Sequence, residues 1–127
     1  MLSKKDRSYL SVARYLATKS NARNTHGALV VKGGRVLGSG FNKNRNHPKI
    51  VSPEHIKTEC SFHAEQVAIK EAGEDNVKGA VIYVARVNRQ GLDRDSKPCP
   101  RCSALIKRVG IKKVVFTAEA GEYYVSN

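Results

Sequence analysis

The sequence predicts an α/β protein in which a central mixed sheet of about five strands carries helices on both faces. Three observations carry this prediction: helical and strand patterns alternate along the chain, residues 79–87 are almost continuously apolar, and a Gly-Gly turn joins two short strands. An apolar run without polar alternation is typical of a strand that is covered on both faces. We expect residues 1–127 to form a single domain, because this length supports one hydrophobic core.

The first helix is expected from Ser3 to about Lys19, with Ser3 and Asp6 at the spacing of a capping box. One apolar stripe runs along it at positions i, i+3, i+4 and i+7: Tyr9, Val12, Ala13 and Leu16. The pattern that follows predicts strands at 27–31 and 35–40. The turn between them contains Gly-Gly, which suits the positive φ angles of a tight hairpin.

Further along, helices are expected at 62–72 and 99–109, and each is followed by a glycine that would end it. Pro100 suits the first turn of the second of these helices. Buried strands are expected at 79–87 and 112–117, with a charged loop between 88 and 97. A last edge strand at 123–125 follows so short a turn that it should run antiparallel to the strand before it.

The stretch from Phe41 to Lys57 is the least regular part of the chain, and it is rich in asparagine and contains two prolines. Long irregular stretches in compact domains are usually functional or disordered. Because this one leads directly towards His63, we interpret it as a wall of the substrate pocket. The alternative is a mobile surface loop.

Composition and charge limit the classes of function. Hydrophobic residues make up 40% of the chain, and no apolar run approaches the roughly 18 residues of a membrane span. The basic N-terminus leads into no signal region, so we expect a cytoplasmic protein without a membrane partner. The net charge is +12, of which residues 1–57 hold +10 and residues 58–127 hold +2. A basic half indicates a partner that carries phosphate, although a lysine-rich solvated surface is the simpler alternative.

Two short motifs carry the chemistry: His63-Ala64-Glu65, and Pro98-Cys99-Pro100-Arg101-Cys102. One imidazole and two thiolates are three zinc ligands, and a catalytic zinc keeps its fourth position open. Two cysteines in C-x-x-C are more typical of a metal site than of a disulfide in a reducing compartment. Glu65 is not needed as a ligand and can move protons. The alternative is a structural zinc site closed by a fourth ligand, for which the candidates are Cys60, His47, His55 and His26.

These motifs match the H-x-E and P-C-x-x-C signature of zinc-dependent nucleobase deaminases. The chain therefore resembles the cytidine and deoxycytidylate deaminase superfamily. The resemblance implies a three-layer cytidine-deaminase-like fold, a Zn²⁺ cofactor held by His63, Cys99 and Cys102, and hydrolytic conversion of cytosine to uracil with release of ammonia. It assigns to Glu65 the proton transfers between water, the ring nitrogen and the departing ammonia.

The resemblance also implies substrate contacts. The main chain at Ala64 and Cys99 would contact the base, and Asn42 would bind the sugar. Basic residues before the motif, Lys43 and Arg45 first and Lys49 and Lys57 after them, suit a nucleotide phosphate. We expect a small cytosine nucleotide or nucleoside as substrate and a homo-oligomeric protein.

Two alternatives stay open. His63 in place of a cysteine is similar to the deoxycytidylate, tRNA adenosine and APOBEC-type branches, so the substrate could be single-stranded nucleic acid bound through the basic N-terminal half. The short sequence after residue 117 departs from those branches, which usually continue into a further helix. The other alternative is a zinc module that binds nucleic acid without catalysis. Glu65 distinguishes a catalytic zinc site from such a structural one, since a structural site needs no unliganded carboxylate beside the metal.

Overall fold

The computed structural model describes residues 3–20, 25–44, 61–119 and 123–126. The main sheet has the strand order β2-β1-β5-β7-β8, and a sixth strand, β6, pairs with the end of β5. The bounds of the strands in this sheet are β1 Thr25–Lys32, β2 Arg35–Phe41, β5 Val81–Val87, β6 Asp93–Arg94, β7 Lys113–Thr117 and β8 Tyr123–Ser126. Only β5 and β7 pair in parallel, and the other pairs are antiparallel. The predicted mixed sheet is confirmed, and β8 is antiparallel to β7 as the short turn requires.

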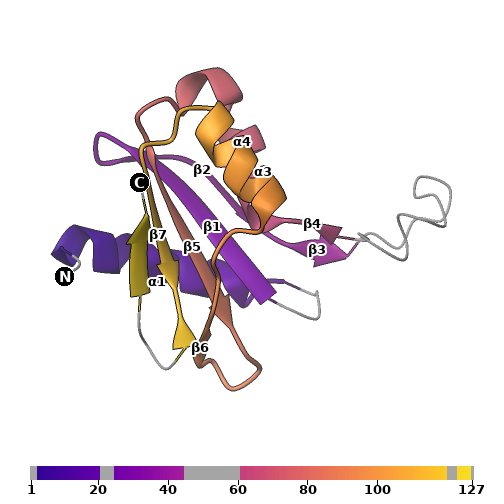
Figure 1. Ribbon diagram of the computed structural model, residues 1–127. Helices are drawn as coiled ribbons and strands as arrows, with labels where there is room; N and C mark the ends of the chain where they lie inside the picture. The colour runs from indigo at the N-terminus through magenta and orange to yellow at the C-terminus, as the bar shows by residue number, and fades with distance from the viewer. Residues whose placement is uncertain (1–2, 21–24, 45–60, 120–122, 127) are drawn as a thin grey trace, which may run out of the picture.

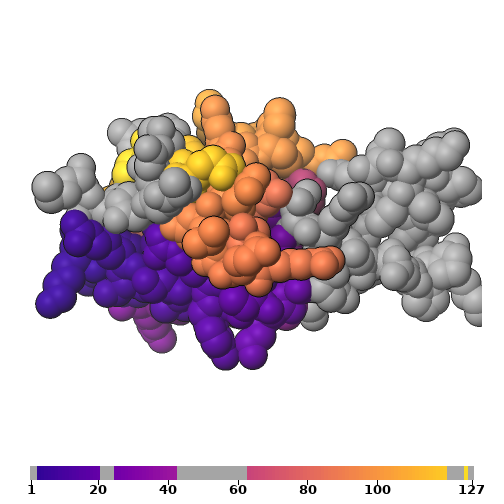
Figure 2. All heavy atoms as spheres, turned by 90° about the horizontal axis from the view of Figure 1, so that it is seen from below, coloured from indigo at the N-terminus to yellow at the C-terminus, as the bar shows by residue number. Residues whose placement is uncertain are grey.

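Helix α1 (Lys4–Ala17) covers one face of the sheet, while α3 (Ala64–Ala72) and α4 (Pro100–Arg108) lie side by side on the other (Figure 1). Figure 2 looks along the layers, with α1 in indigo and α4 in orange on opposite sides of the molecule. A single 3-10 turn, η1 (Glu74–Asn76), follows α3. The three-layer α/β fold expected from the sequence is therefore confirmed.

The central strands are apolar on both faces because each face meets its own helix layer. Along β5, Ile82 and Val84 pack into the core under α3 and α4, whereas Tyr83 and Ala85 pack into the core under α1. Neighbouring β1 divides its residues in the same way. The two cores together explain why the sequence shows a continuous apolar run at β5 without alternation.

Helix α1 is attached to the sheet through a buried carboxylate. Ser3 is the N-cap, and its Oγ accepts a hydrogen bond from the Asp6 backbone N–H at 3.0 Å, which confirms that half of the predicted capping box. The Asp6 carboxylate accepts hydrogen bonds from the Tyr83 hydroxyl at 2.6 Å and from Lys113 Nζ at 3.0 Å. These contacts join the first turn of the helix to two central strands.

The predicted stripe of α1 is confirmed at three of its four positions, since Ala13 is fully buried and Tyr9 and Leu16 pack, partly buried, against the same core. Leu10 and Ala17 are fully buried together with Ala13, while the side chain of Val12 is 43% exposed. Burial of Asp6 turns the helix so that Leu10, four residues later, faces the sheet. The most buried line of the helix thus runs through Leu10, Ala13 and Ala17, with Tyr9 and Leu16 at its sides.

The turn between β1 and β2 is a two-residue hairpin, since Lys32 pairs with Arg35. Gly33 and Gly34 have φ angles of 60° and 75°, and two positive φ angles are what a type I′ turn requires. On β2, a Cβ atom at Gly38 would lie 2.3 Å from the backbone oxygen of Ala68. Glycine at this position therefore lets α3 approach the sheet closely.

Three short strands, besides the turn η1, were not predicted. β3 (Lys43–Asn44) and β4 (Ser61–Phe62) form a small antiparallel pair, and β6 lies within the predicted loop 88–97. The β3–β4 pair holds residues 44 and 61 together, next to Asn42 and His63. Most of the irregular stretch that we interpreted as a pocket wall, together with Arg45, Lys49 and Lys57, lies outside the described residues. Within the described residues no helix is both long and apolar enough to cross a bilayer.

Candidate active site

Each motif of the sequence stands at the start of a helix. His63 is the N-cap of α3, with φ −76° and ψ 143°, and Cys99 is the N-cap of α4, with φ −65° and ψ 165°. The sequence had placed His63 inside the first helical turn, and that was wrong. An extended N-cap is not bound by the angular spacing of a helix, so residues 63 and 65 both reach the same site although they are two apart.

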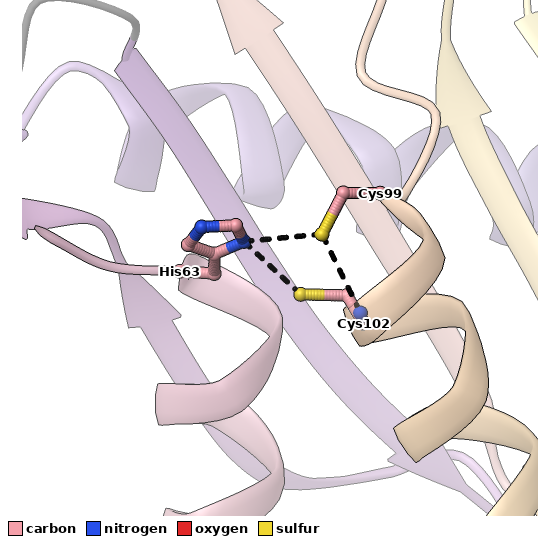
Figure 3. A group of neighbouring side chains, drawn as sticks. All are labelled: His63, Cys99 and Cys102. Carbon is pink, nitrogen blue, oxygen red and sulfur yellow. Dashed lines mark hydrogen bonds between the residues drawn. The ribbon is translucent and has the colours of Figure 1, made fainter. Parts of the chain in front are cut away.

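The three predicted ligand side chains meet between the two helix starts (Figure 3). His63 Nδ1 lies 3.2 Å from Cys102 Sγ and 3.5 Å from Cys99 Sγ. All three ligand atoms lie within 4.8 Å of one another. In a tetrahedral zinc site with ordinary Zn–N and Zn–S bond lengths, neighbouring ligand atoms are separated by about 3.5–3.8 Å. The donor set therefore fits zinc in both chemistry and spacing.

The two sulfur atoms differ in environment. Cys99 is partly exposed, and its Sγ accepts the Cys102 backbone N–H at 3.5 Å. Cys102 is fully buried, and burial raises the pKa of its thiol far above the ordinary value, with further contributions from the nearby Glu65 and Cys99. A buried sulfur beside a carboxylate and a second sulfur is costly to ionise without a cation. A divalent metal would remove that cost by coordinating the thiolates.

Glu65 belongs to the site without belonging to the group of ligand atoms. Its side chain is buried, at 4% exposure, and it lines a pocket of about 230 Å³ next to the metal-binding group. Among the described residues the metal-binding group consists of His63, Cys99 and Cys102. His26, one of the candidates for a fourth ligand, lines the pocket but lies outside this group, whereas Cys60, His47 and His55 fall outside the described residues.

Asn42 and Ala64 also line this pocket, and the substrate contacts expected of them stay predictions. Asn42 is 7% exposed, and its Oδ1 accepts hydrogen bonds from the His26 backbone N–H at 2.7 Å and the Ser20 hydroxyl at 2.6 Å. The amide is therefore held in one orientation. Lys43 follows Asn42 on β3, and Arg45 lies outside the described residues.

Two lining residues of the pocket, His26 and Lys97, were not among the substrate contacts expected from the sequence. His26 sits at the start of β1, where the strand pattern gives no sign of the site. Lys97 directly precedes Pro98-Cys99, and its position next to the motif was the available signal. The pocket is thus formed by β1, the residue after β2, the start of α3 and the loop that leads into α4.

Comparison with known proteins gives this site a family. The model of the cytidine and deoxycytidylate deaminase zinc-binding region matches residues 3–118. The chain belongs to this family. The predicted superfamily and zinc cofactor are therefore confirmed, and a zinc-dependent hydrolase of C–N bonds is confirmed at the level of the family.

Individual relatives differ in how much of their length the chain spans. It is 30% identical to a deoxycytidylate deaminase of Mycobacterium phage D29 over 91% of this chain and 95% of that protein. It is 33% identical to the riboflavin biosynthesis protein RibD of Aquifex aeolicus over 91% of this chain, but it spans only 28% of that protein. A solved structure of dCMP deaminase from cyanophage S-TIM5 shares 27% identity with a TM-score of 0.67, covering 91% of this chain and 84% of that one.

Proposed function

We propose that this protein hydrolyses the exocyclic amine of cytosine in a nucleotide or nucleoside of the dCMP or cytidine type, giving uracil and ammonia. One observation carries the proposal: a buried carboxylate, Glu65, lines the same pocket as the three metal ligands without joining them. A structural metal site gains nothing from such a group, whereas a hydrolytic site needs one. The likeness to the deoxycytidylate deaminase of phage D29 supports cytosine as the base.

His63, Cys99 and Cys102 would hold the zinc, which when bound lowers the pKa of water towards neutrality and so supplies the nucleophile. Glu65 is assigned three proton movements. It accepts a proton from the attacking water, delivers it to the ring nitrogen next to C4, and transfers the second water proton to the amine as the C4–N bond breaks. The oxygen of water remains on C4, and the nitrogen leaves as ammonia.

The remaining lining groups bind the substrate. The main chain at Ala64 and Cys99, at the two helix starts, is assigned to the edge of the base. Asn42, whose Oδ1 accepts two hydrogen bonds that hold the amide in place, is assigned to a sugar hydroxyl. The pocket volume of about 230 Å³ is below the range of about 300–1,000 Å³ typical of drug-sized ligands. It suits a base with part of its sugar, and the rest of the substrate would lie at the mouth.

The proposal is tested with zinc-loaded protein and a panel of substrates: dCMP, CMP, deoxycytidine, cytidine and an oligodeoxycytidine. We expect uracil and ammonia in equal amounts from at least one of the monomers, and none with Glu65→Gln. If only the oligonucleotide reacts, the nucleic-acid alternative is correct. If zinc binds stoichiometrically and no substrate reacts, the result favours the alternative of a zinc module without catalytic activity. The expected homo-oligomer stays a prediction that light scattering of the same sample would check.

A further inference from the structure

We propose that Lys97 recognises the 5′-phosphate of the substrate and makes the enzyme select a mononucleotide over a nucleoside. This inference rests on the proposed function, and it names a residue that the sequence did not single out. The sequence favoured Lys43 and Arg45 for this task. The structure brings a different lysine to the pocket, from the loop that carries Cys99.

The charges that line the pocket support this assignment. The described lining residues are His26, Asn42, His63, Ala64, Glu65, Lys97 and Cys99. Glu65 is a carboxylate and Cys99 is a sulfur ligand, so both disfavour an anionic substrate. Within this described lining, Lys97 is the one lysine or arginine. A phosphate placed near Lys97 would be attracted there and kept away from Glu65.

The exposure of Lys97 also suits contact with a phosphate at the solvent side of the pocket. The base must reach the metal ligands and Glu65, which is 4% exposed, so the other end of the substrate points towards solvent. Lys97 is an exposed residue on the pocket wall. It lies two positions before Cys99, which starts α4 beside the metal-binding group. One loop therefore contributes both a metal ligand and an exposed lysine to the lining of the pocket.

The loop that carries Lys97 is anchored by buried polar contacts of Ser96, the residue before it. The Ser96 hydroxyl, which is 1% exposed, donates to the Val84 carbonyl oxygen and also lies within hydrogen-bond distance of the Thr117 carbonyl oxygen. The backbone N–H of Lys97 donates to Asp95 Oδ1 at 3.0 Å. The backbone at Lys97 is thus fixed while its side chain is exposed. Recognition by a fixed residue loses less entropy than recognition by a loop that must first become ordered.

The test measures kcat/KM for dCMP and for deoxycytidine with Lys97→Gln, Lys97→Arg and the wild type. Lys112→Gln is the matched control, because it removes the same charge from an exposed lysine that does not line the pocket. A hydrogen bond to a charged group corresponds to a loss of about 10- to 100-fold. We expect Lys97→Gln to lose about that factor with dCMP, mainly through KM, and to change deoxycytidine turnover by less than about twofold. Lys97→Arg should retain most of the dCMP activity.

A second measurement keeps the inference separate from the proposed function. Calorimetry compares the binding of the product dUMP and of deoxyuridine to the same zinc-loaded variants. We expect dUMP affinity, and not deoxyuridine affinity, to fall in Lys97→Gln even if turnover fails for another reason. Equal losses with dCMP and deoxycytidine would overturn the inference, since Lys97 would then act on the base or on Cys99. An unchanged preference for dCMP, or a wild-type enzyme that accepts only nucleosides, would overturn it as well.

Discussion

Replacing Glu65 with glutamine is the most direct test of the chemistry. Glutamine keeps the size of the side chain and can accept a hydrogen bond, but it cannot take up a proton at neutral pH. Among the described residues that line the pocket, Glu65 is the only carboxylate, so no other acid in that set can replace it. We expect turnover to be abolished in practical terms while the fold and the bound zinc are kept.

The magnitude follows from the number of proton transfers assigned to this one group. A general acid or base typically contributes about 10²- to 10⁴-fold to the rate. Because Glu65 is buried and serves both the water and the departing amine, we expect a loss near the upper end, about 10⁴-fold, or about 5.5 kcal/mol in the barrier.

The assay is uracil formation under saturating substrate, with zinc content measured on the same samples. Glu71→Gln is the matched control, because it makes the same change on an exposed residue of the same helix, and it should keep activity within about twofold of the wild type. Glu65→Gln activity above about a tenth of the wild-type value would refute the assigned role. Loss of zinc in this variant would also refute it, since it would make Glu65 a ligand.

Three further outcomes are expected. Cys102→Ser should reduce zinc from about one equivalent per chain to a small fraction, and Cys99→Ser should do the same, measured by metal analysis after gel filtration; full zinc in either variant would contradict the ligand set. Asp6→Ala should lower the free energy of unfolding by about 1–3 kcal/mol at pH 7, because the buried Tyr83 hydroxyl loses its partner. Burial alone would raise the pKa of Asp6, but hydrogen bonds from Tyr83 and Lys113 and the Lys113 charge outweigh it and hold the pKa below the ordinary value of 3.8. The stability that comes from ionised Asp6 is therefore present above about pH 4 and is lost as pH falls through the lowered pKa, so denaturant titrations of wild type and variant should converge at low pH. Gly38→Ala should destabilise the protein by about 1–3 kcal/mol or more in the same titration, because its Cβ would meet the Ala68 carbonyl oxygen; an unchanged midpoint would show that α3 can move away.

Much of the fold could be read from the sequence because strong local signals agreed with the tertiary structure. The apolar run at β5 predicted a strand covered on both faces, and Gly33-Gly34 predicted the hairpin. The centre of the buried face of α1, at Leu10, could not be read, because Asp6 is a buried carboxylate whose partners lie 77 and 107 residues away. β3, β4 and β6 have two residues each, too few for any periodic pattern.

The site was predictable in its ligands and less so in its walls. His63, Cys99 and Cys102 follow a spacing that zinc chemistry imposes, so the motif alone was sufficient to name them. The pocket walls obey no such spacing. Lys97 and His26 reach the pocket only because the loop before α4 and the start of β1 are brought together by the sheet. His26 requires the three-dimensional arrangement before it can be recognised, and for Lys97 the sequence offers only its position next to the motif.

The two helices that carry the metal ligands have ligand residues at their N-cap positions in place of preferred N-cap residues. Helix α1 begins with Ser3, a preferred N-cap whose hydroxyl accepts a backbone N–H at 3.0 Å. Helices α3 and α4 begin instead with His63 and Cys99, residues that are not among the preferred N-caps. Local contacts compensate only in part. Gln66 Oε1 accepts the His63 backbone N–H at 3.1 Å, and the Cys99 sulfur accepts an N–H at 3.5 Å.

Zinc would stabilise these two helix starts, because it would bind both N-cap side chains and so link α3 to α4. Metal binding and helix capping therefore use the same atoms, and the two cysteine variants should differ once the metal is absent. Serine at position 99 is a better N-cap than cysteine, whereas serine at position 102 places a hydroxyl in a fully buried position. In the metal-free state, Cys99→Ser should therefore be at least as stable as the wild type and Cys102→Ser less stable, although both have lost the ion.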